Sequence, residues 1–237
     1  MVQENIIHSN CWFAYFDQLG FKHDIQQFLK SYQNKLNVFV SVEYKSILDI
    51  IEYVFKEYKG KIIPWWFSDT FMFFSTDGTA ESFIDLESAV QFFLAKVTWQ
   101  RQPFRGAISY GETYADMEKK ILVSQALIEA HDFAEKQNWI GLVLTPSARK
   151  QLKNVAPTLS DGFLHCWEYD VPVHIKSPKK EGTEKLLASN ISRYAEIQNR
   201  VEQMKQEAKN KSDVQDRESI KVKYDNTIKF FNWCKSQ

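Results

Sequence analysis

Hydrophobic positions along the chain follow two spacings, one typical of β-strands and one typical of helices. The run CWFAYFDQL at residues 11–19 ends at Gly20 and predicts a buried strand. Residues 24–58 have helical spacing, clearest in SILDIIEYVFKEY, and predict one or two helices. The apolar runs KIIPWWF and TFMFFS follow, separated only by Ser68 and Asp69, which is the length of a tight hairpin connection. Asp69 is therefore expected at a hairpin tip.

The same spacings assign the rest of the main body. Residues 81–100 predict a helix with one apolar face, FRGAISYGETY predicts a strand, and residues 121–137 predict another helix. WIGLVLTP predicts a strand with Pro146 opening a short helix, and FLHCWEY with VPVHIK predicts a closing hairpin. Helices alternate with strands that are also joined by hairpins. The expected fold class is α+β, a ferredoxin-like mixed antiparallel sheet with covering helices.

A polar segment, SPKKEGTEK, predicts a boundary between the main body, residues 1–176, and a C-terminal helical extension, residues 177–237. In the extension, apolar residues recur at steps of three and four on both sides of a polar gap at residues 208–216, which predicts a C-terminal helical hairpin. The two apolar stripes are Leu187, Ile191, Tyr194, Ile197, Val201 and Met204, and then Ile220, Tyr224, Ile228, Phe231 and Cys234.

Composition excludes several classes of protein. The 237 residues are 44% hydrophobic and 15% aromatic, enough for a real core, and 30 basic residues balance 30 acidic ones, so no nucleic-acid partner is expected. The N-terminus lacks the pattern of a signal peptide and charges interrupt every apolar stretch, so no membrane partner is expected either. The scattered cysteines, Cys11, Cys166 and Cys234, fit neither a disulfide framework nor a zinc knuckle and favour a cytoplasmic location.

Two carboxylates, Asp17 and Asp69, carry the most informative chemistry. Each ends an apolar strand, and in a ferredoxin-like sheet the end of the first strand lies beside the tip of the next hairpin. Two ionised groups held that close repel, and a divalent ion such as Mg²⁺ is one way to stabilise both, since it binds a few carboxylates together with substrate phosphates. The loop from Gln18 to Asp24 leads to a helix start, whose N–H groups can hold a phosphate. Together these features predict a nucleoside triphosphate site.

At these residues the sequence resembles the class III nucleotidyl cyclases. FDQLGF looks like their first metal motif, F-x-D-I-x-G-F, and SDTFMFF resembles their second, G-D-x-x-M-x-F. The segment RGAISYG, residues 105–111, resembles their R-x-G-I-x-x-G strand and turn, with Ala107 in place of the first glycine. The resemblance covers about residues 11–150 and depends on the order and spacing of the motifs.

The resemblance implies a lyase whose two aspartates bind two Mg²⁺ or Mn²⁺ ions per site and whose sites lie at the interface of a homodimer. By this carry-over Asp17 and Asp69 are the catalytic metal ligands, and the backbone carbonyl of Gln18 joins one ion. Residues 19–21, Leu19, Gly20 and Phe21, line the phosphates. The ribose 3′ hydroxyl attacks the α-phosphate, and the product is a 3′,5′-cyclic nucleotide. Residues 1–176 are then the catalytic domain.

Departures from the family pattern concern the base and the ribose. Adenine-using cyclases place a Lys where Trp65 stands, and an Asn and an Arg where Ser124 and Ile128 stand. The stretch SQALIEA followed by WIG instead resembles the stand-alone bacterial cyclases of Pycsar antiphage systems, which implies UTP or CTP as substrate and cUMP or cCMP as a messenger for a separate effector. Trp65, Ser124 and Arg105 are the further candidate nucleotide-binding residues, and Trp65 is equally interpretable as a core aromatic.

Three other functions remain open from the sequence. The missing Asn and Arg favour a catalytically silent, cyclase-like nucleotide-binding module, whereas the presence of Asp17 and Asp69 speaks against it. A purine cyclase keeps the reaction and changes the base. A palm-type polymerising nucleotidyltransferase also sets two aspartates on this fold, but normally needs a basic template groove that a neutral composition does not indicate.

Overall fold

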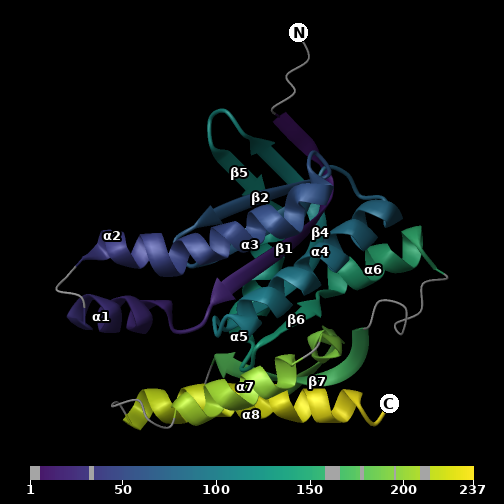
Figure 1. Ribbon diagram of the computed structural model, residues 1–237. Helices are drawn as coiled ribbons and strands as arrows, with labels where there is room; N and C mark the ends of the chain where they lie inside the picture. Colours follow the sequence, from purple (N-terminus) through teal and green to yellow (C-terminus); the bar gives the residue numbers. More distant parts are fainter. Residues whose placement is uncertain (1–5, 32–34, 158–165, 177–178, 195, 209–213) are drawn as a thin grey trace.

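The computed structural model describes residues 6–31, 35–157, 166–176, 179–194, 196–208 and 214–237. Within these residues one mixed sheet of eight strands has the order β2-β3-β1-β4-β6-β8-β7, with β5 also paired to β4 (Figure 1). Only β4 and β6 pair in parallel among the described strands. The strands are β1 (Ile6–Gln18), β2 (Ile62–Phe67), β3 (Thr70–Ser75), β4 (Phe104–Asp116), β5 (Ile121–Ser124), β6 (Gly141–Leu144), β7 (Cys166–Lys176) and β8 (Lys179–Ser189).

Helices cover both faces of this sheet, which confirms the predicted α+β class (Figure 1). The helices are α1 (Phe21–Ser31), α2 (Leu36–Phe39), α3 (Lys45–Phe55), α4 (Ala80–Trp99), α5 (Gln125–Lys136), α6 (Pro146–Val155), α7 (Ile197–Ala208) and α8 (Val214–Cys234). One π-helical turn, Val40–Tyr44, joins α2 to α3, and short 3₁₀ turns occupy Lys56–Tyr58 and Ile191–Arg193. None of the helices in the described residues is long and apolar enough to cross a membrane.

Alternation along β1 determines which of its side chains reach each helix layer. Trp12 and Phe16 face α4, where their rings lie 4.6 Å from Phe83 and 5.4 Å from Phe93 between centroids. Tyr15 points to the opposite face, with its ring 5.3 Å from that of His131 on α5. Because successive side chains alternate, Asp17 falls on the α5 face of the sheet.

Two predicted elements differ from the observed ones. Residues 121–124 were expected in a helix, yet they form β5 and pair with Thr113–Asp116 of β4, and the helix begins only at Gln125. The expected hairpin between FLHCWEY and VPVHIK is instead the single strand β7, and residues 163–165 of that prediction lie outside the described residues. Pro172 is tolerated within β7 because this strand ends the sheet, where a missing N–H needs no neighbour.

The predicted boundary segment is part of the sheet. Much of SPKKEGTEK forms β8, which pairs with both β7 and β6, and Leu187 of the first predicted helical stripe lies opposite Leu144 there. The helical spacing in the tail becomes α7 from Ile197, and α8 begins at Val214, inside the expected polar gap.

The predicted helical hairpin is present and packs against the body of the protein. Helix α7 packs against α8 and α4, and α8 contacts β7 (Figure 1). The ring of Phe230 lies 4.9 Å from that of Trp139 and 4.8 Å from that of Tyr169. The hydroxyl oxygen of Thr227 accepts a hydrogen bond from the backbone N–H of Ile140 at 2.9 Å. These contacts fix α8 against the segment that leads into β6.

Candidate functional site

Asp17 and Asp69 lie at adjoining strand ends, as the sequence predicted. Asp17 sits opposite Thr70 of β3 and Arg105 of β4, and Asp69 occupies the two-residue turn between β2 and β3. The backbone N–H of Gln18 donates to the carbonyl oxygen of Asp69 at 3.0 Å, which ties the end of β1 to the hairpin tip. The turn is tight, since Ser68 adopts φ of 55°.

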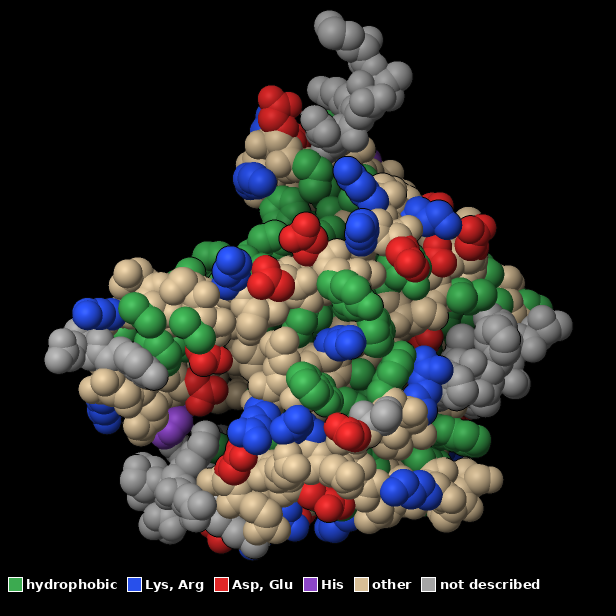
Figure 2. Space-filling model, in the orientation of Figure 1, with side chains coloured by type: hydrophobic (Ala, Val, Ile, Leu, Met, Phe, Trp, Pro, Cys, Tyr) green, Lys and Arg blue, Asp and Glu red, His purple; other side chains and the backbone are tan. Residues whose placement is uncertain are grey.

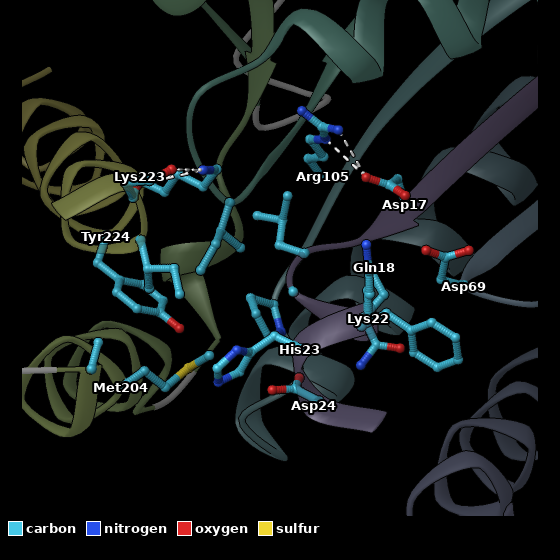
Figure 3. A pocket seen from close by; sticks show the side chains of 18 of the residues that line it. Asp17, Gln18, Lys22, His23, Asp24, Asp69, Arg105, Met204, Lys223 and Tyr224 are labelled. Carbon is cyan, nitrogen blue, oxygen red and sulfur yellow. Dashed lines mark hydrogen bonds and ion pairs between the residues drawn. The ribbon is translucent and has the colours of Figure 1, made fainter. Parts of the chain in front are cut away.

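Arg105 holds the Asp17 carboxylate in the free chain. Its Nε and Nη2 atoms donate to one oxygen of Asp17, Oδ2, at 3.1 and 2.9 Å (Figure 3). The same guanidinium donates to Glu135 Oε1 at 2.7 Å and to the backbone carbonyl oxygens of Glu135 and Gln137 at 2.6 and 3.2 Å. These carbonyls lie at the C-terminal end of helix α5, where the helix dipole favours a positive charge. Arg105 thus connects Asp17 to the C-terminus of α5.

Burial perturbs the Asp17 carboxylate. Its side chain is only 16% exposed, and burial raises its pKa from 3.8 to about 6, with the carboxylates of Glu135 and Asp69 acting in the same direction and Arg105 opposing them. A carboxylate with a raised pKa next to an arginine is a frequent feature of functional sites. Asp17 is therefore held in a state that a further cation would stabilise.

A cavity of about 530 Å³ opens beside these residues (Figure 3). Seven of the predicted site residues line it: Asp17, Gln18, Leu19, Gly20, Phe21, Asp69 and Arg105. Gly20 turns the chain from β1 into α1 with φ of 84°, a conformation that favours glycine. The structure thus brings the predicted metal and phosphate residues together around one cavity.

Trp65 and Ser124 lie away from that cavity. Trp65 is half-buried on β2, opposite Met72, and packs against the core. Ser124 caps helix α5, since its buried hydroxyl oxygen accepts from the N–H of Leu127 at 3.1 Å and is 2.7 Å from the hydroxyl of Thr113. Within one chain, neither residue contributes to the space beside Asp17 and Asp69.

Several lining residues were missed by sequence reasoning. Lys22, His23 and Asp24 lie in the loop whose backbone was predicted to hold a phosphate, but their side chains were not singled out, although their position directly after the FDQLGF motif was a usable signal. Glu135 reaches the site only because α5 ends beside β4, and the tail residues Met204, Lys223 and Tyr224 reach it only through the packing of α7 and α8 (Figure 3). No local pattern identifies those four.

The oxygen ligands at the cavity fit a divalent ion whose remaining ligands come from substrate phosphates. Two carboxylates, Asp17 and Asp69, share one side of the cavity with the backbone of Gln18. No cluster of three or more His, Cys, Asp or Glu side chains in the described ranges is arranged to hold a metal by itself. Mg²⁺ and Mn²⁺ sites of triphosphate-using enzymes commonly have few protein carboxylates, because phosphates and water supply the remaining ligands.

Comparisons with known proteins concern the fold. No protein-family model matches the chain, and no curated protein matches it in sequence. Among solved structures it is similar to the catalytic core of a rhodopsin-guanylyl cyclase with converted specificity in complex with ATPαS, with 11% identity, a TM-score of 0.50, and 77% of this chain and 96% of that chain covered.

Two further solved structures give weaker matches. A bacterial light-regulated adenylyl cyclase is 12% identical with a TM-score of 0.48 over 83% of this chain and 98% of that chain. An adenylate/guanylate cyclase/hydrolase from Silicibacter pomeroyi is 11% identical with a TM-score of 0.46 over 78% of this chain and 99% of that chain. The similarity to the guanylyl cyclase core shows that the chain has the fold of a nucleotidyl cyclase catalytic domain.

Proposed function

We propose that the chain is a divalent-metal-dependent nucleotidyl cyclase, which converts a nucleoside triphosphate into a 3′,5′-cyclic nucleotide and pyrophosphate. The observation that carries the proposal is the pairing of Asp17 and Asp69 at the ends of β1 and the β2–β3 hairpin, beside a cavity, in a fold of this kind. Two carboxylates at this place suit a phosphoryl transfer that depends on positioning and charge.

The side chains at the cavity have separable roles in this reaction. Asp17, Asp69 and the carbonyl of Gln18 would hold two Mg²⁺ or Mn²⁺ ions, which when bound supply charge that acidifies the ribose 3′ hydroxyl and stabilises the leaving pyrophosphate. Arg105 keeps its contacts with Glu135 and the end of α5 when Asp17 turns to another cation, so a positive charge remains at the cavity. The first turn of α1 supplies N–H groups and Lys22 beside the phosphates.

A homodimer is part of the proposal. Val123 on β5 and Ile128 on α5 are 66% and 65% exposed, and lie close together along the chain on the elements that follow β4. Exposed apolar side chains of this size suit a protein interface. The resemblance assigns Ser124 and Trp65 a role at the nucleotide, and because neither lines the cavity within one chain, a site shared between two copies would accommodate that role.

The base preference and the biological role are finer parts of the proposal. Trp65 stands where adenine-using relatives carry a cation, which supports UTP or CTP over ATP as substrate. The resemblance to Pycsar cyclases supports cUMP or cCMP as a messenger that activates a separate effector in antiphage defence. On the face drawn in Figure 2, acidic and basic side chains are interspersed, which supports a mononucleotide substrate over a nucleic-acid template.

One experiment tests the reaction and the base together. The protein is incubated with an equimolar mixture of UTP, CTP, ATP and GTP and Mn²⁺, and products are identified by mass spectrometry. We expect cUMP first and cCMP second, with both exceeding cAMP and cGMP, and no product from the Asp69→Ala variant. Dominant cAMP or cGMP would refute the pyrimidine preference alone. Binding of nucleotide without any cyclic product would instead favour the silent nucleotide-binding module.

A further inference from the structure

A second cavity lies beside the junction of β1 and α1, and neither Asp17 nor Asp69 lines it. It has a volume of about 460 Å³ and is bordered by α1, by the π-helical turn with the helices on either side of it, and by the loop between α4 and β4. Figure 1 shows α1 and α2 side by side at one end of the fold. Aromatic and aliphatic side chains form much of the lining: Phe21, Phe28, Phe39, Tyr44 and Ile47. A concave space of this size with aromatic walls is typical of a small-molecule site.

Two buried amide oxygens at this cavity have no hydrogen-bond donor. Gln18 and Gln102 both line the cavity and are each 7% exposed. The Oε1 atom of each is buried without a partner among the residues that the structure describes. The Gln18 side chain lies on the α4 face of the sheet, since side chains alternate along β1 and Asp17 falls on the α5 face. Buried acceptors without a donor are rare and costly, so a ligand with N–H or O–H groups would stabilise this part of the chain.

The amide of Gln102 has a fixed orientation. Its Nε2 atom donates to the backbone carbonyl oxygen of Glu43 and to the hydroxyl oxygen of Ser46, at 3.3 Å in each case. Exchanging the amide nitrogen and oxygen would set the oxygen of Gln102 against the carbonyl oxygen of Glu43. The unpaired atom is therefore the oxygen, and the partner that it lacks is a donor.

Helix α1 is the wall of the cavity that can move. Neither amide oxygen is open to water in the free chain, so a ligand reaches them only when a neighbouring element shifts. None of the α1 side chains is buried, and its Phe21 and Phe28 rings contact the ring of Phe39 at 5.8 and 5.4 Å between centroids. An element with so few buried side chains moves at a low cost in free energy. An aromatic ligand that enters here would replace these ring contacts as α1 shifts outward.

The charges of the lining favour a hydrogen-bond donor over an anion. The carboxylates of Asp24 and Glu43 border the cavity together with the two unpaired amide oxygens. Arg101 also lines it, and its guanidinium contacts the carboxylate of Glu207 on α7 at 3.2 Å. A phosphate or nucleotide brings more acceptors and more negative charge, so it matches this cavity poorly. A neutral or cationic aromatic molecule with N–H or O–H donors matches it better.

Two uncommon backbone conformations border the cavity. Residues Val40–Tyr44 form the π-helical turn, and Arg101 adopts φ of 67°, in the left-handed region that residues other than glycine rarely occupy. Turns of the π type occur frequently at functional sites, and a strained residue persists only where the surrounding structure fixes it. Tyr44 of this turn and Arg101 both line the cavity. These conformations support a role for the cavity beyond core packing.

We propose that this second cavity is a regulatory site that binds a small aromatic molecule with N–H or O–H donors. Four residues line both this cavity and the one beside Asp17: Gln18, Phe21, Asp24 and Arg101. A ligand that shifts α1 therefore also changes the first turn of α1, where the phosphates are proposed to bind. Binding at the second cavity does not depend on the proposed function, whereas its effect on turnover rests on that function. By linkage, the nucleotide changes the affinity for this ligand by the same factor.

Ligand-observed NMR titrations test the site with a matched pair of probes. Tryptophol carries an indole N–H and a hydroxyl donor, and its N,O-dimethyl derivative keeps the ring without either donor. Gln27→Trp places a bulky ring at the cavity, because Gln27 lines it from the exposed side of α1. Gln26→Trp is the matched control, since Gln26 is the neighbouring exposed glutamine of α1 and does not line the cavity. Gln102→Met removes one of the two unpaired oxygens.

We expect the wild type and Gln26→Trp to bind tryptophol with a dissociation constant on the order of 1 mM or lower, and about threefold to tenfold more tightly than the dimethyl derivative. Gln27→Trp should weaken both probes by about tenfold or more, because its ring occupies the space that they need. Gln102→Met should weaken tryptophol about threefold to tenfold, the effect of one neutral hydrogen bond, and leave the dimethyl derivative unchanged. The two tryptophan variants should have equal melting temperatures, because both positions are exposed.

Other binding results overturn the inference. If Gln27→Trp binds tryptophol as Gln26→Trp does, the probe lies elsewhere on the molecule. If the wild type binds neither probe at about 10 mM, the cavity is not a site for aromatic molecules of this class. If the wild type binds both probes equally, the unpaired amide oxygens do not contribute and the assigned ligand chemistry is wrong.

The effect on turnover is measured separately. Cyclic product from UTP and Mn²⁺ is followed with and without saturating tryptophol in the wild type, Gln26→Trp and Gln27→Trp. We expect the rate to change about twofold or more in the first two proteins and to stay the same in Gln27→Trp. Binding without any change in rate would overturn the regulatory role. If the wild type forms no cyclic product at all, the proposed function fails, and the regulatory role fails with it, while the NMR titrations still decide whether the second cavity binds its ligand.

Discussion

Replacing Asp17 by Asn should stabilise the free protein while it abolishes the reaction. The ionised carboxylate of Asp17 is disfavoured in the folded chain, since burial raises its pKa to about 6 in spite of Arg105. Asn carries no charge, yet its amide oxygen can still accept from the guanidinium that now bonds Asp17 Oδ2. The substitution therefore removes the unfavourable charge and keeps a hydrogen bond.

The expected size follows from the pKa. Between the ordinary value of 3.8 and the folded value of about 6, the ionised form is destabilised by about 3 kcal/mol relative to the protonated form. The favourable contribution of the protonated carboxyl is complete below pH ~3.8 and is lost as the pH rises through about 6. The advantage of Asn should thus be near zero at pH ~3.5, grow across this window and level off above it. A gain of up to about 3 kcal/mol corresponds to up to about 6 to 12 °C in melting temperature for a chain of this size.

Thermal unfolding of the wild type and Asp17→Asn, followed by circular dichroism from pH 4 to 8 without divalent ions, measures this difference. Asp132→Asn is the control, because Asp132 lies on α5 with its side chain 63% exposed, next to the exposed ring of His131. A variant that is less stable than the wild type at pH 8 would refute the reasoning, since the ion pair with Arg105 would then outweigh the burial of Asp17. Millimolar Mn²⁺ with nucleotide should raise the melting temperature of the wild type only.

Three further outcomes are expected. Asp69→Ala should abolish cyclic product and leave the circular dichroism spectrum unchanged, because Asp69 occupies a turn; retained turnover with Mn²⁺ would contradict the metal assignment. Light scattering should give about twice the chain mass of 27.9 kDa, and Ile128→Glu should shift the mass toward one chain; a wild-type monomer under active conditions would exclude the dimer. Glu87→Gln should raise stability above pH ~7, since burial raises the pKa of Glu87 to about 7 and so destabilises its ionised form; unchanged denaturant midpoints at pH 8 would contradict this.

Elements whose pattern is local were predictable from the sequence. The strand around Asp17, the hairpin with Asp69 at its tip and the long helix α4 all follow from spacing and from the length of one turn. Elements whose state depends on distant neighbours were not. Residues 121–124 have apolar spacing that suits a helix or a strand. They form a strand because they pair with β4. Residues 179–185 are polar, yet pairing with β7 holds them in the sheet as the first part of β8.

The same distinction applies to the candidate site. Asp17, Gly20 and Asp69 are recognisable because each stands next to an element end that the sequence marks. Tyr224 and Met204 are not, because an apolar stripe on a predicted helix is consistent with ordinary core packing, and both are indeed largely buried. Met204 and Tyr224 line the cavity beside Asp17 because α7 and α8 pack against the main body of the protein. Glu135 depends in the same way on where α5 ends.

The charges at the cavity lead us to expect that the proposed nucleotide and cation bind together. Asp17, Asp69 and Glu135 face Arg105 and Lys22, so with all groups ionised the carboxylates exceed the cations on that side. A nucleoside triphosphate is itself strongly negative, and its phosphates would be repelled there by Coulomb interactions that burial strengthens. A divalent ion reverses this balance and leaves Arg105 available to the phosphates, because Asp17 no longer needs its guanidinium. On the proposed function, we therefore expect nucleotide without the ion, or the ion without nucleotide, to bind weakly, and both together to complete the site.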